Sequence, residues 1–265
     1  MLNKGVFFWL SILSALAVMA FLALPMISMM CAPEASAVKE ALSDKLVVDS
    51  VLLSLYTAGL TALICLVAGT PFAYLLARKE FPGKKLLMSI VDIPIVIPHP
   101  VVGIAILGVT GRNHWFGRIL LDFGIRVMGS KVGIIAVMVF VAMPFFINAV
   151  REGFASVSPR LENVSMSLGA SKLTTFRRIT LPLAWRSILA GLIMSAARAL
   201  SEFGAVVVVA YHPMIAPVLM YERYEAYGLR YSQPVAFILV VVSLIVFVAL
   251  RFATAGQAAK VEERV

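Results

Sequence analysis

Two oppositely charged residues, Arg198 and Glu202, stand in an otherwise apolar stretch of the sequence. If that stretch is helical, residues four apart lie on one face and can form an ion pair. Ionisable residues inside a membrane span are costly and usually face the bundle interior or an aqueous cavity. The pair is therefore predicted either to lock a helix bundle or to line a polar pathway.

A second candidate is the proline-rich stretch Asp92–Gly103, which contains Pro94, Pro98 and Pro100. Each proline removes one helical hydrogen bond. Non-helical backbone at membrane depth persists only where protein buries it or water reaches it. Two interpretations stay open, a short extended segment before a helix or a distorted element beside a pathway. His99 is interpreted as a polar residue with hydrogen-bond partners rather than as an ion ligand.

The usual signatures of enzymatic chemistry are missing from the sequence. It has no Gly-x-x-x-x-Gly-Lys-Ser/Thr phosphate loop, no His-Glu-x-x-His zinc pair and no Gly-x-Ser-x-Gly nucleophile turn. Cys31 and Cys65 have no metal-binding spacing. We therefore expect no catalytic residue, no metal and no cofactor on this chain. An intramembrane enzyme is the alternative class, but no nucleophile–base spacing links its ionisable residues.

The composition indicates an integral membrane protein. Hydrophobic residues make up 61% of the 265 residues and charged residues 14%, whereas soluble domains are about half apolar and about a quarter charged. Six stretches are long enough to cross a bilayer, which takes about 20 helical residues. They are residues 6–30, 51–77, 86–109, 131–150, 183–211 and 234–253. The predicted fold class is an all-α integral membrane protein with six transmembrane helices.

The distribution of Lys and Arg predicts how the chain is oriented in the membrane. With six spans the two termini lie on one side, and the short loops on that side carry more Lys and Arg than the others. Cytoplasmic loops carry this excess, so both termini and the segment 158–182 are predicted to be cytoplasmic in a multi-pass protein of the cell membrane. This topology explains the net charge of +9, and no nucleic-acid partner is expected.

The segment 158–182 is polar, yet it carries the signals of ordered structure. Pro159 can open a helix after Ser158 and Gly169 can end it, because proline is tolerated in the first turn and glycine accepts a left-handed cap. The basic stretch Lys172–Arg178 then leads to Pro182, which suits the first turn of the next helix. An ordered helix–turn–helix between apolar runs indicates a docking site for another protein.

This segment resembles the cytoplasmic coupling loop of ABC-importer permeases, whose pattern is Glu-Ala-Ala, three residues, Gly, nine residues, Ile-x-Leu-Pro. Gly169, Ile179, Leu181 and Pro182 match in register. The triplet falls on residues 163–165, so that Glu162 comes one residue early. The resemblance extends over about residues 50–250. It implies these ATPase-coupling residues: Glu162, Asn163, Val164, Ser165, Leu168, Gly169, Ala170, Ile179, Leu181 and Pro182.

The spacing Arg198-x-x-x-Glu202-Phe203-Gly204 and the proline-rich stretch are similar to segments of molybdate, tungstate and sulfate permeases. The resemblance implies a tetrahedral oxyanion as cargo, molybdate or tungstate first and sulfate or thiosulfate as the alternative. It implies these pathway or gate residues: Pro98, His99, Pro100, Gly103, Arg198, Glu202 and Gly204. An ATP-independent secondary transporter is the other class, for which paired broken helices are typical, whereas the sequence indicates only one broken span.

The resemblance also implies an assembly and a division of the chain. A type I importer would comprise two ATP-binding subunits that hold ATP and Mg²⁺, a second permease subunit, most simply a homodimer, the lipid bilayer around them, and an extracytoplasmic oxyanion-binding protein. Residues 1–50 are expected to form an N-terminal anchor helix and external loop. The permease core is expected at 51–253, with the coupling loop at 158–182, and a short cytoplasmic tail at 254–265.

The loop after the third span is predicted to contain a short interfacial helix on the external side. Apolar residues recur at helical spacing from Trp115 to Phe123, as in helices that lie in a membrane interface. Arg112, Arg118 and Arg126 accompany them. Two interpretations stay open, simple interfacial anchoring, or a surface that attracts the anion or docks an acidic face of the binding protein. The aromatic stretch 211–228 is likewise either an anchor or a binding-protein contact.

Overall fold

The computed structural model describes residues 4–262, and every regular element in that range is a helix. The elements are α1 (Lys4–Cys31), α2 (Ala35–Ser43), α3 (Lys45–Ile64), η1 (Cys65–Gly69), α4 (Thr70–Arg78), α5 (Lys84–Val96), α6 (His99–Thr110), α7 (Trp115–Asp122), α8 (Lys131–Ser156), α9 (Pro159–Ser167), α10 (Lys172–Thr175), η2 (Phe176–Thr180), α11 (Leu181–Leu200), α12 (Gly204–Val209), α13 (Ala216–Tyr227) and α14 (Leu229–Glu262). The all-α fold class is confirmed. Part of the predicted tail, residues 263–265, lies outside the described residues.

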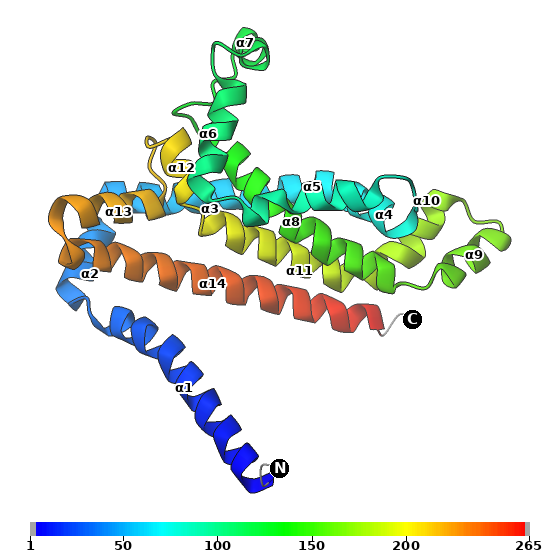
Figure 1. Ribbon diagram of the computed structural model, residues 1–265, viewed down its shortest axis with the longest axis horizontal. Coiled ribbons are helices and arrows are strands. Elements are labelled where there is room, and N and C mark those ends of the chain that lie inside the picture. Colours follow the sequence, from blue (N-terminus) through cyan, green and yellow to red (C-terminus); the bar gives the residue numbers. More distant parts are fainter. Residues whose placement is uncertain (1–3, 263–265) are drawn as a thin grey trace.

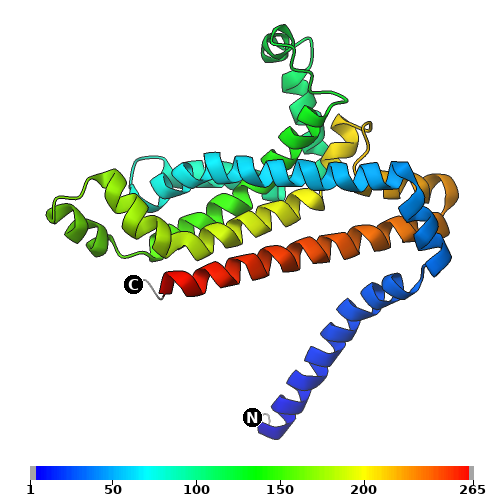
Figure 2. The same cartoon turned by 180° about the vertical axis from the view of Figure 1, so that it is seen from behind.

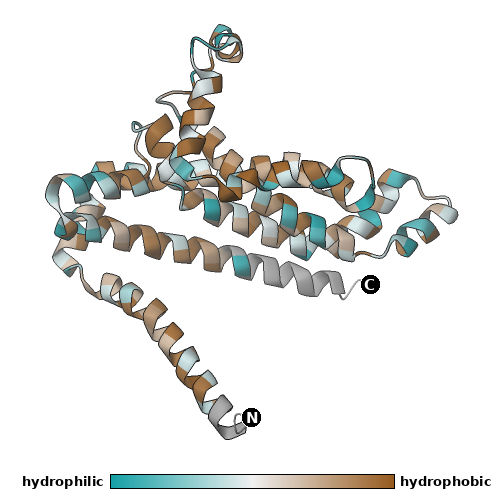
Figure 3. Cartoon of the chain, in the orientation of Figure 1, coloured by the Kyte–Doolittle hydropathy of each residue, from teal (hydrophilic) through white to brown (hydrophobic). Residues whose placement is uncertain are grey.

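The long helices form one elongated bundle (Figure 1). α8 packs against α11, α4 and α3, and α14 packs against α11. α9 and α10 lie at one end of the bundle, and α2 and α13 at the other. Three elements depart from this arrangement, since α6 and α7 project away from the bundle and α1 diverges from it (Figure 2). Hydrophilic residues gather at the two ends, whereas hydrophobic ones cover the long helices between them (Figure 3).

Five helices in the described range are long and apolar enough to cross a membrane: Phe8–Cys31, Lys45–Arg78, Lys131–Ser156, Lys172–Leu200 and Leu229–Ala249. The pair α5 and α6 makes a sixth span if the two count as one, but it is bent by 114°. Two predicted spans are therefore corrected. The third is not one helix over 86–109, because the prolines interrupt it. The fifth runs from Lys172 to Leu200 rather than over 183–211, because the chain leaves the helix at Ser201–Phe203 and α12 begins anew.

Two π-turns explain how prolines are accommodated within long helices. η1 directly precedes Thr70-Pro71, and η2 directly precedes Leu181-Pro182. Inside an α-helix a proline lacks the donor for residue i−4 and clashes with that carbonyl, whereas a π-turn contains an extra residue. After η2, the Leu181 N–H donates to Phe176 O, five residues back. Pro182 therefore does not open a new helix, as the sequence suggested, but lies within a continuous one.

The core lies along α8. Val137, Met138, Val141, Phe146 and Phe154 are each at most 1% exposed. Small residues let neighbouring helices approach α8 closely. A Cβ atom at Gly69 of η1 would lie 2.6 Å from the Phe146 ring. This tight centre fixes the relative positions of the spans that carry the candidate sites.

Candidate functional site

His99, Arg198 and Glu202 meet where two broken helices come together, and we call them the His99–Arg198–Glu202 cluster. Arg198 Nη2 donates to Glu202 Oε2 at 2.9 Å. His99 Nδ1 lies 3.0 Å from the same Glu202 oxygen. The other oxygen, Oε1, accepts from the backbone N–H of Ala205 at 3.0 Å. Glu202 therefore binds two side chains and also the first turn of α12.

The three side chains of the cluster differ in how exposed they are. The Glu202 side chain is 1% exposed, that of Arg198 20% and that of His99 37%. A guanidinium has donors only, and Arg198 Nη2 lies 2.7 Å from His99 Nε2 and 2.9 Å from His99 Nδ1. The buried carboxylate is thus fully paired, and the side of the cluster nearest solvent is imidazole and guanidinium.

Close packing of α6 against α12 holds the cluster in place. A Cβ atom at Gly103 would lie 2.7 Å from Ala205 O, and one at Gly204 would lie 3.0 Å from the His99 Cβ. Neither position has room for a larger residue without a shift of backbone or side chain. Pro98 is the N-cap of α6 and Pro100 lies in its first turn. The structure therefore brings all seven predicted pathway residues to one junction of α6, α11 and α12.

The proline-rich stretch is a sharp bend between two helices, which favours the second of its two interpretations, a distorted element. α5 continues through Pro94 and ends at Val96, and α6 begins at His99. On the α5 side, Asp92 accepts a hydrogen bond from Asn148 Nδ2 at 2.7 Å, which ties α5 to α8. The sequence indicated one broken span, and among the described residues the bent pair of α5 and α6 is the one such case. The break between α11 and α12 follows the end of the fifth span at Leu200.

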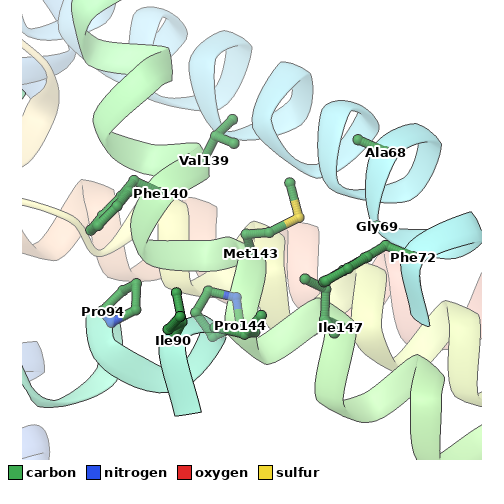
Figure 4. A pocket seen from close by; sticks show the side chains of 11 residues that line it. Ala68, Gly69, Phe72, Ile90, Pro94, Val139, Phe140, Met143, Pro144 and Ile147 are labelled. Carbon is green, nitrogen blue, oxygen red and sulfur yellow. The ribbon is translucent and has the colours of Figure 1, made fainter. Parts of the chain in front are cut away.

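An apolar cavity of about 390 Å³ lies beside this bend (Figure 4). It is framed by η1 and α4, by α5 and by α8. Its walls include Gly69, Phe72, Pro94, Met143 and Pro144. Because it offers almost no polar group, it is no site for an anion. Among the residues described, no group of three or more His, Cys, Asp and Glu side chains is close enough to hold a metal ion.

The segment 158–182 contains the predicted helix with both of its caps. α9 starts at Pro159, and Ser158 Oγ accepts from Arg160 N at 3.4 Å. Gly169 has φ +90°, the left-handed conformation that favours glycine. The N–H of Ala170 donates to Ser165 O at 3.1 Å, and that of Gly169 to Met166 O at 3.0 Å. This is a Schellman motif, which terminates α9 rigidly.

α9 and α10 present two different faces. Leu161, Val164, Leu168 and Leu173 are 48, 53, 83 and 59% exposed. An exposed apolar patch at the polar end of a bundle is typical of a protein–protein contact. Among the other predicted coupling residues, Asn163 is exposed, Ser165 is half-buried, and Ile179, Leu181 and Pro182 lie within the continuous helix. We call Leu161, Val164, Leu168 and Leu173 the apolar docking face.

Glu162 points away from the docking face and is only 8% exposed. Its Oε1 accepts from Arg78 Nη2 at 2.8 Å, from Arg78 Nε at 3.0 Å and from Thr180 Oγ1 at 2.6 Å. Sequence analysis missed both partners. Arg78 lies 84 residues before Glu162. Its place at the end of an apolar span is the only sign in the sequence that it could contact the segment 158–182.

The predicted interfacial helix is present as α7. Trp115 is 67% exposed and Phe123 78%, and α7 lies at the far end of α6 from the bundle (Figure 1). Arg112, Arg118 and Arg126 are all exposed. In the part of the chain that the structure describes, none of these three forms an ion pair. The surface around α7 is therefore both apolar and positively charged.

The aromatic stretch 211–228 contains the whole of α13, which is tied to neighbouring elements. Arg223 forms an ion pair with Asp44. Asp44 also caps α3 by accepting from Leu46 N at 2.8 Å. This backbone hydrogen bond, together with the Arg223 guanidinium, lowers the pKa of Asp44 below its usual value. Asp44 thus stays ionised and holds α2, α3 and α13 together at this end of the bundle.

Comparison with known proteins identifies the class of protein that has this fold. Residues 69–258 match the family described as binding-protein-dependent transport system inner membrane component. The chain belongs to this family. It is a multi-pass membrane component of a transport system, and not an enzyme.

Several relatives have named functions. Over 235 residues the chain is 46% identical to the molybdate/tungstate transport system permease protein WtpB of Pyrococcus furiosus, covering 88% of this chain and 89% of that protein. The protein of the same name from Methanocaldococcus jannaschii is 38% identical over 232 residues, covering 87% and 90%. The sulfate transport system permease protein CysT of Synechocystis sp. is 33% identical over 198 residues, covering 73% and 69%.

Solved structures of ABC importers share the fold. A bacterial ABC transporter that imports the acidic polysaccharide alginate superposes with a TM-score of 0.76 at 17% identity, over 95% of this chain and 96% of that one. The MetNI methionine ABC transporter in an inward-facing conformation gives a TM-score of 0.64 at 19% identity, over 82% and 96%. These similarities establish the type I permease fold.

Proposed function

We propose that this chain is the permease subunit of an ATP-driven importer that moves a tetrahedral oxyanion, molybdate or tungstate, across the cell membrane. The observation that carries the proposal is the 46% identity to a molybdate/tungstate permease over 88% of the chain. The sulfate permease is a more distant relative at 33% identity, so sulfate or thiosulfate is the second choice of cargo.

The His99–Arg198–Glu202 cluster is the proposed gate on the anion's path. Glu202 neutralises Arg198 at a distance of 2.9 Å, so an oxyanion would meet a guanidinium whose charge is already paired. Such a site attracts an anion weakly and releases it readily, as transport requires. Because α6, α11 and α12 all contribute, a change at either helix break would open or close this junction.

The apolar docking face on α9 and α10 is the proposed contact with the ATP-binding subunit. ATP and Mg²⁺ would be bound by that subunit, present in two copies, and its closure would push α9 as a rigid body. The spans would then rock between inward-open and outward-open states. We infer that α9, α10 and both chain termini are cytoplasmic, because the ends of α4 and α8 and the start of α5 lie with α10 at one end of the bundle (Figure 1). These segments carry Arg78, Arg151 and Lys85, and η2, which follows α10, carries Arg178.

A second copy of this chain would complete the pathway, since one permease supplies half of it. The opposite, external end would receive an oxyanion-binding protein. The surface around α7, with Arg112, Arg118 and Arg126 exposed, is the proposed contact for an acidic face of that protein. One related structure is an alginate importer in complex with its periplasmic protein, which supports an external docking partner.

Reconstitution of the complex in liposomes tests the proposal. The chain, the ATP-binding subunit and the binding protein are combined, and uptake of molybdate, tungstate and sulfate is followed with and without ATP. ATP-dependent uptake of molybdate or tungstate is the expected result. Uptake of sulfate alone would favour the second cargo. Uptake without ATP would contradict the proposal in favour of a secondary transporter.

A further inference from the structure

The docking face alone does not explain how a push on α9 would reach the membrane spans. α9 is joined to α8 through a short turn at Val157 and Ser158, and to α10 through Gly169, whose φ is +90°. A helix held only at these two joints would swivel when pushed. The side of α9 that faces the bundle must therefore supply the rigidity.

That side is held through one carboxylate oxygen. Glu162 Oε1 accepts from Arg78 Nη2 at 2.8 Å, from Arg78 Nε at 3.0 Å and from Thr180 Oγ1 at 2.6 Å. The Arg78 and Glu162 side chains are 10% and 11% exposed, and Thr180 is fully buried. Hydrogen bonds to ionised groups are short and strong, and their strength rises where water is excluded.

The Arg78 guanidinium also binds the turn that follows α8. Its Nη2 also donates to the backbone oxygen of Val157 at 3.0 Å, in the turn between α8 and α9. Arg78 is the last residue of α4, and Thr180 is the last residue of η2, directly before α11. The same few atoms therefore join α9 to the ends of three spans. The guanidinium presents its donors in a rigid planar fork, so Nε and Nη2 bind the carboxylate while Nη2 also binds the carbonyl.

Aromatic packing stiffens the same junction. The Tyr74 ring of α4 meets the Phe154 ring of α8 edge to face at 5.3 Å, and the Phe176 ring of η2 at 5.0 Å. Ser165 and Thr175 are hydrogen-bonded at 3.0 Å, which links α9 to α10. None of these groups lies on the apolar docking face, so the junction is separate from the surface that would contact a partner.

We infer that Arg78, Glu162 and Thr180 form a clamp that makes α9 move as one body with α4, α8 and α11. They are positioning residues for the coupling of ATP hydrolysis to transport. The docking face receives the force and the clamp directs it into the spans. This inference rests on the proposed function, and it gives Glu162 an internal role rather than one at the partner surface.

The test measures anion transported per ATP hydrolysed, in the reconstituted complex, for R78M, R78K, E162Q and T180V. K79M is the matched control, because Lys79 is the exposed neighbour of Arg78. R78M and E162Q are expected to bind the ATP-binding subunit normally and to lower the ratio at least about fivefold, the lower end of usual coupling between sites. R78K should keep part of the ratio, since lysine keeps the positive charge opposite Glu162 but lacks the rigid fork of donors that binds Glu162 through two nitrogens.

A double variant separates a clamp from independent structural effects. If Arg78 acts through Glu162, R78M combined with E162Q lowers the ratio no further than R78M alone. An unchanged ratio in R78M and E162Q, or a double variant whose loss is the product of the two single losses, would overturn the inference. If R78M does not assemble with the ATP-binding subunit, the ratio measured for T180V tests the inference. Valine has the same shape as threonine and lacks only the hydroxyl that binds Glu162. A T180V ratio equal to that of K79M would then overturn it.

Failure of the proposed function gives a different result. In that case the wild-type complex shows no ATP-dependent uptake of molybdate, tungstate or sulfate. If only the clamp is absent, wild-type uptake stays intact, and R78M, E162Q and T180V transport as much anion per ATP as K79M does.

Discussion

The carboxylate of Glu202 lies 2.9 Å from Arg198 Nη2, although the helix that carries Arg198 ends at Leu200, between the two residues. Glu202 also accepts the N–H of Ala205 at 3.0 Å, in the first turn of α12. One side chain therefore determines where α11 stops and where α12 begins. A change of conformation at this junction has to remake both interactions.

Replacement of Glu202 should separate these two roles. E202Q keeps an acceptor for the Ala205 N–H but leaves Arg198 without its counter-charge, whereas E202A removes both. Breaking a buried ion pair by removal of one partner costs roughly 3–5 kcal/mol, which the 20% exposure of Arg198 lowers. We expect both variants to reduce uptake, and E202A also to lower the thermal stability of the detergent-solubilised chain. Wild-type uptake in E202A would exclude a role for this junction in transport.

Gly169 is expected to be required for its backbone conformation rather than for space. No atom lies within 4 Å of a Cβ built at Gly169, where φ is +90°, and the same open space surrounds Gly59 without a positive φ. A left-handed conformation costs a residue other than glycine roughly 1–2 kcal/mol. G169V should therefore lower the transport per ATP, G169N less so because asparagine tolerates this region, and G59A not at all. Equal ratios in G169V and G59A would refute the requirement.

Leu168 is the most exposed residue of the apolar docking face, at 83%. L168E places a charge where an apolar contact is proposed, so the amount of ATP-binding subunit that co-purifies should fall strongly. Ser167 is its exposed neighbour outside that face, and S167E is the matched control. Equal recovery of the subunit with L168E and S167E would show that this face is not the contact.

Arg118 lies in α7 and Arg126 follows it, and both are exposed. We expect them to raise the rate at which an acidic partner associates. Complementary charges raise association rates, and salt screens them. R118Q combined with R126Q should lower the affinity for the binding protein at low salt and flatten its salt dependence, while K39Q on α2 should not. If the double variant binds as tightly as wild type at every salt concentration, α7 serves only as an interfacial anchor.

Local signals in the sequence predicted part of this structure well. The caps of α9 depend on Ser158, Pro159 and Gly169, which act within a few residues and were therefore readable. The Arg198–Glu202 pair was predicted, but for an incorrect reason, since the helix does not continue between them. The only stop signal in Leu-Ser-Glu-Phe-Gly is Gly204, and it lies beyond the break, as the first residue of α12.

Contacts between distant segments could not be predicted. Arg78 and Glu162 are 84 residues apart, and neither one specifies the other. The two π-turns were equally hidden, although Pro71 and Pro182 mark the places where a plain α-helix would be strained. In physical terms, the sequence encodes capping and periodicity locally, whereas ion pairs and helix breaks within a bundle are decided by packing.

The most direct test of a gate at the junction of α6 and α12 is a reversible cross-link. A Cβ at Gly204 would lie 3.0 Å from the Cβ of His99, slightly closer than the roughly 3.5–4.5 Å of a disulfide. H99C and G204C are combined in a chain whose Cys31 and Cys65 are replaced by serine, and ATP-driven molybdate uptake is compared before oxidation, after it and after reduction. The account predicts that oxidation stops uptake and that reduction restores it to the level before oxidation. Unchanged uptake with the cross-link complete, as verified by thiol labelling, would contradict it.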